Sequence, residues 1–226
     1  NAGATVSFTN DDGTGLGWNN GSKITSLAIN GGTVTSPGII HVWNLGNSLT
    51  LAGGTLQSNN GTSDAAGPQL EWADTTITTQ ANANPSVIAG RVRFRPDSGT
   101  LHTFDVADGA AATDLLVSAA LTESSRSNLL KTGAGTLRLT GSVQITGTIN
   151  VEAGTLDFAP SAVSASLRIT VTDGAHLNLS NAGTTVVKNV YIAGQRLAAG
   201  TWGAPGSGAA NESPALTGTG ILQITD

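Results

Sequence analysis

Acidic and histidine side chains are the first candidates for chemistry in this sequence of 226 residues, which has 15 Asp+Glu, 3 His and no Cys. Hydrolysis of a glycosidic bond needs two carboxylates about 5–9.5 Å apart. The only adjacent acids, Asp11 and Asp12 in the turn-like segment 10–15, fit either a solvated turn or a calcium loop. The other acids are scattered, and the histidines show neither metal-ligand spacing nor a serine-hydrolase pattern. We therefore predict that the chain is not an enzyme and needs no cofactor, calcium at Asp11 and Asp12 being the one alternative.

The tryptophans fit sugar recognition better, because a flat aromatic face packs against the C–H surface of a sugar ring. Four of the nine aromatic residues are Trp. Trp18 lies in the polar, turn-like segment 17–21, where a buried indole is unexpected. Side chains alternate along a strand, so His41 and Trp43 point outward together if their neighbours point inward. These positions predict a carbohydrate-binding surface.

Polar side chains of two further segments extend this surface. Glu71 and Trp72 fall on opposite faces of one strand, so Trp72 also fits a core position, and Arg91 and Arg93 share one face of another strand. If these strands stack in register with that of His41, their outward strip suits a linear polysaccharide. The alternative is that Arg and Glu pair across neighbouring strands and keep the sheet soluble. The predicted sugar-binding residues are Trp18, His41, Trp43, Glu71, Trp72, Arg91 and Arg93.

Composition excludes several classes of protein. The formal net charge is −5, with 10 Lys+Arg and no basic patch, which argues against nucleic-acid binding. The absence of Cys excludes a disulfide framework, and no apolar run approaches the roughly 18 residues of a membrane span. Charged residues make up only 11% of the chain, against about 25% in ordinary domains. The chain begins without Met, and we expect it to be an excised mature segment.

The secondary-structure elements that would position these side chains are short strands that repeat. Apolar residues alternate with Thr, Ser and Asn in short runs separated by Gly, Asn and Asp, a pattern typical of strands and turns. The stretch 110–127 is the one segment that we predict to be a helix or an irregular loop. A unit of strand, Gly turn, Thr and apolar residue recurs with a period of about 20 residues. Its copies lie at residues 29–34, 51–56, 97–101, 132–137, 151–156 and 171–177.

A period of this length predicts an all-β solenoid, a parallel β-helix of about nine to ten coils with loop insertions. Stacked coils align Val, Ile and Leu into one core, while Gly supplies the positive φ of the turns. An antiparallel β-sandwich is the competing architecture, but the recurrence of one turn motif favours the β-helix. We predict a single domain over 1–226, with cap regions at 1–28 and 190–226 and the coils at 29–189.

Residues 128–141 and 147–156 resemble the autotransporter-associated β-strand repeat. The first segment reads Asn-Leu-Leu-Lys-Thr-Gly-Ala-Gly-Thr-Leu-Arg-Leu-Thr-Gly, and the second reads Gly-Thr-Ile-Asn-Val-Glu-Ala-Gly-Thr-Leu. The segment 190–222 is similar to the C-terminal end of such proteins. The resemblance implies a right-handed parallel β-helix in secreted bacterial proteins, a shared scaffold without a shared activity. Similar β-helical segments also occur as carbohydrate-binding modules beside glycoside hydrolases that act on plant cell walls.

Two functions follow as hypotheses. The first is a secreted, non-catalytic carbohydrate-binding module, with a linear plant hemicellulose such as xylan as its ligand and a catalytic domain fused to it. The alternative is a structural passenger or adhesin stalk of a bacterial surface protein. The irregular region 59–128 favours the first, because a stalk should show more uniform repeats. Neither hypothesis involves nucleic acid or a membrane.

Overall fold

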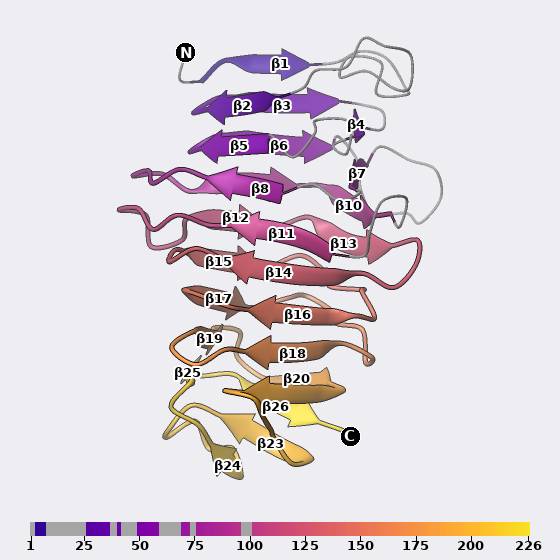
Figure 1. The fold of residues 1–226 in the computed structure, drawn as a ribbon, viewed down its shortest axis with the longest axis vertical. Coiled ribbons are helices and arrows are strands. Elements are labelled where there is room, and N and C mark those ends of the chain that lie inside the picture. The colour runs from indigo at the N-terminus through magenta and orange to yellow at the C-terminus, as the bar shows by residue number, and fades with distance from the viewer. Residues whose placement is uncertain are drawn as a thin grey trace.

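The computed structural model describes residues 3–7, 26–36, 40–41, 49–58, 69–72, 76–95 and 101–226. These residues form strands joined by turns, and no helix occurs among them. Figure 1 shows the strands stacked along the long axis of the molecule from the N-terminal to the C-terminal end. Neighbouring strands pair in parallel except for two antiparallel pairings, β21 with β22 and β23 with β26. The fold is the predicted all-β parallel β-helix, while its handedness and its number of coils remain predictions.

Three sheets form the sides of the stack, and a fourth lies at its C-terminal end. Sheet A comprises β1 (Thr5–Ser7), β3 (Thr33–Ser36), β6 (Thr55–Ser58), β9 (Ser86–Ala89), β12 (Leu115–Val117), β15 (Thr136–Leu139), β17 (Thr155–Phe158), β19 (His176–Leu179) and β25 (Leu216–Gly218). Sheet B comprises β2 (Leu27–Asn30), β5 (Leu49–Ala52), β8 (Thr76–Thr79), β11 (Leu101–Asp105), β14 (Asn128–Thr132), β16 (Thr148–Val151), β18 (Arg168–Val171), β21 (Asn189–Ile192) and β22 (Gln195–Arg196). Sheet C comprises β4 (Ile40–His41), β7 (Leu70–Trp72), β10 (Arg91–Phe94) and β13 (Ala120–Glu123). Sheet D comprises β20 (Thr184–Val187), β23 (Gly200–Gly203), β24 (Asn211–Glu212) and β26 (Ile221–Ile224).

The core consists of inward-facing columns that run from coil to coil. In sheet B the register pairs Leu129 with Ile149, Ile149 with Ile169, and Ile169 with Val190. All four side chains are almost completely buried. Because strands alternate their side chains with period two, the Thr and Asn residues between these positions face outward. Stacking therefore buries one apolar face that a single coil could not bury alone.

Paired glycines form the tight turns between sheets B and A. Gly133 has a φ of +75°, in the left-handed region that glycine adopts without steric cost. A Cβ atom on Gly135 would lie 2.4 Å from the carbonyl oxygen of Ala107 in the preceding coil. The first glycine thus allows the chain to turn, and the second allows two coils to approach closely.

Two details of the sequence prediction are wrong. The stretch 110–127 contains β12 and β13, because pairing with strands on both sides overrides the weak local signal of its Ala and Ser residues. The copy at 97–101 is not equivalent to the others, since Leu101 begins a strand of sheet B rather than of sheet A. One coil takes 20 residues from Leu129 to Ile149 but 27 from Ile77 to Phe104. The coils between Leu49 and Leu129 are therefore longer than the period of the repeat.

The C-terminal end of the stack departs from the simple coil. The chain leaves β21 through its hairpin with β22, adds β23 and β24, and then returns to sheet A at β25. Figure 1 shows β23 and β24 at the C-terminal end of the stack. Trp202 of β23 is partly buried against the core, and its indole N–H donates to the Ala198 carbonyl at 2.9 Å. Asp226 lies 3.7 Å from Lys188 Nζ and 3.3 Å from Arg196 Nη2. These contacts attach the chain end to the last coils; the division into caps at 28 and 190 remains a prediction.

Candidate functional site

Sheet C carries most of the residues predicted to bind sugar. The register places His41 beside Glu71, Glu71 beside Arg93, and Arg93 beside Thr122. The strands of His41, Glu71 and Arg93 therefore lie side by side with the alignment that the predicted strip requires. Trp18 and Trp43 lie outside the described residues, as do Asp11 and Asp12, and for His41 only the strand position is described.

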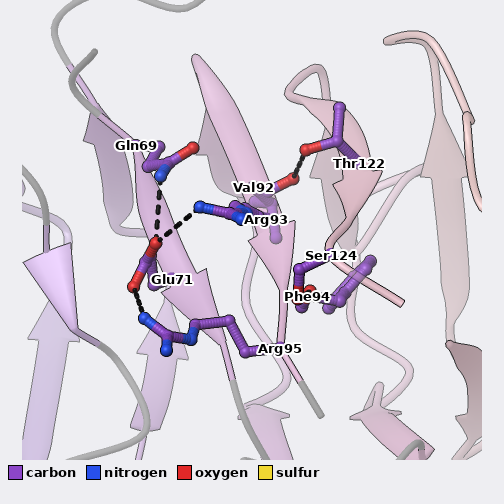
Figure 2. Close-up of polar contacts among 8 residues, drawn as sticks. All are labelled: Gln69, Glu71, Val92, Arg93, Phe94, Arg95, Thr122 and Ser124. Carbon is purple, nitrogen blue, oxygen red and sulfur yellow. Dashed lines mark hydrogen bonds and ion pairs between the residues drawn. The ribbon is translucent and has the colours of Figure 1, made fainter. Parts of the chain in front are cut away.

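Glu71 is the centre of a polar cluster on sheet C. Arg95 Nη1 donates to Glu71 Oε2 at 2.7 Å, and Arg93 Nη1 lies 3.4 Å from Oε1 (Figure 2). Gln69 Nε2 donates to the same Oε1 at 3.0 Å. The Glu71 side chain is only 3% exposed, whereas that of Arg93 is 41% exposed. The carboxylate is thus used to hold two guanidinium groups and does not present a free acceptor to a ligand.

Trp72 is a core residue, which corrects its assignment to the sugar-binding set. Its side chain is 1% exposed. The indole is stacked on Phe94 with ring centres 6.0 Å apart and meets Phe104 edge-on at 5.7 Å. An indole covered in this way has no free face for a sugar ring.

Arg91 is also buried, so its predicted place in the exposed sugar-binding strip is wrong. The residue is 6% exposed, and its backbone N–H donates to Ser58 Oγ at 2.9 Å. Alternation correctly places Arg91 on the same strand face as Arg93, but that face is covered at Arg91. Among the seven predicted residues, Arg93 is the one whose side chain is both described and substantially exposed.

Lys131 is a buried polar centre that the sequence interpretation missed. It faces inward in a column between Phe104 and Val151, and its exposed fraction is 0%. Its Nζ donates to the carbonyl oxygens of Thr132 at 2.8 Å, Gly133 at 2.7 Å and Ala153 at 3.0 Å. The ammonium group therefore joins the turns of two successive coils.

The charged groups that act on Lys131 are two aspartates of the preceding coil, Asp105 and Asp114. Burial lowers the pKa of Lys131 to about 8, and the negative charges of Asp105 and Asp114 oppose this shift. Lys131 is therefore charged at neutral pH. Asp114 accepts from the backbone N–H of Gly109 at 2.8 Å and of Thr136 at 2.7 Å. This carboxylate links the coil of β11 to the coil of β14, next to the lysine.

His102 is the second buried polar residue that the sequence interpretation missed. It faces inward beside Leu129, is 2% exposed and stacks on Phe94 with ring centres 4.3 Å apart. Neither ring nitrogen has a hydrogen-bond partner. Burial lowers the pKa of His102 to about 4, so the imidazole is neutral at physiological pH. The alternating positions His102 and Phe104 were the available signal that this side chain faces the core.

The described part of the chain contains no group of three or more His, Cys, Asp or Glu side chains suited to a metal ion. The same residues include no helix long and apolar enough to cross a membrane. The polar groups that the structure does bring together, around Glu71 and Lys131, are saturated by internal contacts that tie coils to one another.

Comparison with known proteins gives one match. Residues 129–158 match the model of the passenger-associated-transport-repeat family. This segment spans β14 to β17 and includes Lys131 and all three of its carbonyl partners. The chain therefore carries an autotransporter-associated β-helix repeat, as the resemblance of these residues indicated. Neither the curated proteins nor the solved structures yield a match to the chain, and similarity to carbohydrate-binding modules is not shown.

Proposed function

We propose that this chain is a structural segment of the passenger of an autotransporter-like protein, forming part of a stalk that is secreted or exposed on a bacterial surface. The observation that carries the proposal is the passenger-associated-transport-repeat at 129–158. It supports the structural alternative better than the carbohydrate-binding module that the sequence favoured. A repeat of this kind implies a secreted or surface-exposed bacterial protein.

The physical properties of the stack suit a rigid spacer. Sheets A and B each contain nine strands in an unbroken hydrogen-bonded ladder. Lys131 and Asp114 add polar ties between coils at the turns. Because each coil contacts only its neighbours, added coils lengthen such a rod without changing its cross-section.

The proposal is tested in the full-length parent protein in its own bacterium. An antibody against residues 101–226 should label intact cells or detect the protein in the medium. Gly135→Val, which forces two coils apart, should reduce that signal, whereas Gly194→Ala, at a position with nothing within 4 Å of the added Cβ, should preserve it. A protein found only inside the cell would refute the proposal.

Polysaccharide binding is a second proposal, supported by the register that aligns the strands of His41, Glu71 and Arg93 on sheet C and by the 41% exposure of the Arg93 side chain. Glu71 would hold Arg93 in place rather than contact the sugar. Its partners would be a linear polysaccharide such as xylan and a fused catalytic domain. Affinity electrophoresis against xylan, glucomannan, cellulose and pectin tests it, with Arg93→Ala and Trp43→Ala beside the wild type. Retardation that both substitutions weaken would support this face. No retardation by any of the four would eliminate the proposal.

A further inference from the structure

The third side of the β-helix is interrupted at one place. Sheet C continues beyond β13 through single bridges from Leu121 to Val143 and from Val143 to Val163. The next strand on this side, β20, pairs with β26 in sheet D, and no bridge joins it to Val163. Sheets A and B show no such break across the same coils. A local violation of an otherwise regular pattern is a place to look for function.

Main-chain groups are left unpaired on both sides of the break. Val143 N–H donates to Ala162, and Ser164 N–H donates to Val143, so the N–H and C=O of Val163 point away from that coil. On the other side, Ile221 N–H donates to Gly183 and Thr225 N–H donates to Val187. Alternation along β20 then turns the N–H and C=O groups of Thr184 and Val186 toward the break.

A recess of about 290 Å³ lies at this position. It is lined by residues 160–163 of one coil and by Asn181 and residues 184–186 of the next. Asn181 Nδ2 donates to Thr185 Oγ1 at 3.1 Å, which fixes the orientation of both groups. The hydroxyls of Ser161 and Thr184 make no hydrogen bond within the described chain and are available to a ligand.

We propose that this recess binds one residue of an uncharged sugar. None of the lining side chains carries a charge, so an ionic group entering the recess would lose hydration without a compensating partner. Sugar hydroxyls both donate and accept, which matches the hydroxyl and amide groups of Ser161, Asn181 and Thr184. Pro160, Val163 and Val186 supply apolar surface for the C–H face of the ring.

Size and strand length favour a sugar over a peptide. The recess is at the lower end of the roughly 300–1,000 Å³ range of ligand pockets, which suits a single ring. An added peptide strand needs a row of main-chain partners. Here Val163 offers them on one side and Thr184 and Val186 on the other, and Lys188 N–H already donates to the Leu167 carbonyl at 2.8 Å. The edge is therefore closed after two residues.

The test uses the isotope-labelled 226-residue chain in solution NMR. The probes are D-xylose, D-glucose, D-galactose and N-acetyl-D-glucosamine, with D-glucuronate as a charged comparison and an acetylated Thr-Val-Thr-Val amide as a peptide comparison. At least one neutral sugar should cause saturable shifts confined to residues 160–163 and 181–186. Ser161→Ala should weaken binding about fivefold, the typical effect of losing one hydrogen bond.

A blocking variant and a matched control separate binding from general effects on the fold. Ala162→Phe places a ring at an exposed position of the recess wall and should abolish the shifts. Ala165→Phe, at an exposed position outside the lining, should leave them unchanged. The proposal is overturned by any of these results: no shifts with the four neutral sugars, shifts that persist in Ala162→Phe, equal binding of glucuronate, or a response at residues 184–187 to the peptide alone.

Discussion

Replacing Lys131 by Met removes the ammonium group while keeping an unbranched side chain of similar length in the core column. The volume is nearly conserved, so the cavity contribution is small. The main loss is the donor to three carbonyl oxygens, those of Thr132, Gly133 and Ala153, at 2.7–3.0 Å from Nζ. The Thr132 oxygen keeps the Val106 N–H as a donor at 3.0 Å, so the oxygens of Gly133 and Ala153 are the ones left without a partner. At about 1 kcal/mol for each of these two acceptors, the free energy of unfolding should fall by about 2 kcal/mol.

Desolvation of the ammonium opposes part of this loss, as the lowered pKa of Lys131 shows. The assay is urea unfolding of the isolated chain at pH 7, followed by intrinsic tryptophan fluorescence and by circular dichroism. The matched control is Lys188→Met, because Lys188 is partly exposed and lies 3.7 Å from Asp226. That substitution should cost less than about 0.5 kcal/mol. A Lys131→Met variant as stable as the control would refute the view that this lysine ties the coils together.

Three further predictions concern other residues. For His102, the pKa of about 4 in the folded chain lies below the unfolded value of 6.5, so the unfolded state binds more protons between these values. The wild type should lose about 3 kcal/mol of stability as the pH falls from 6.5 to 4, and His102→Leu should remove most of this dependence in urea midpoints measured across that range. Gly135→Ala should cost about 2–3 kcal/mol because its Cβ would lie 2.4 Å from the Ala107 oxygen, against about 1 kcal/mol for Gly194→Ala; equal thermal midpoints for the two variants would contradict this. Glu71→Gln should lower the free energy of unfolding by about 3 kcal/mol because it leaves the guanidinium groups of Arg93 and Arg95 without their buried carboxylate, and an unchanged denaturation midpoint would show that other groups hold them.

The fold could be predicted from the sequence because its determinants are local. Gly turns such as Gly133 to Gly135 and the two-residue alternation in strands such as Asn128–Thr132 are written in consecutive residues. Coil length was harder to predict, since the longer coils before Leu129 depend on pairing partners far apart in sequence. For the same reason the strands within 110–127 were not recognised.

The candidate site could be predicted only in part. Alternation gives the face of a strand on which a side chain lies, and the register of His41, Glu71 and Arg93 follows from it. It does not show whether another segment covers that face. Glu71 and Arg91 lie on the outer face of sheet C and are nevertheless buried, so their exposure could not be read from the strand pattern.

Lys131 is the opposite case, a residue of a type that is mostly exposed in proteins but that occupies a core position here. A column of similar aliphatic side chains excludes a shift of one residue, which would turn the apolar face outward, but it disfavours a shift of two residues only weakly, because Leu, Ile and Val can replace one another at small cost. A charged group that needs three particular carbonyl oxygens does not tolerate such a shift. Sliding the coil of β16 by two residues would move the Ala153 carbonyl away from Nζ and leave the ammonium group in the core with one acceptor fewer. The lysine therefore contributes to the choice of register as well as to stability, and its place within the matched segment 129–158 gives that repeat a physical role in aligning one coil on the next.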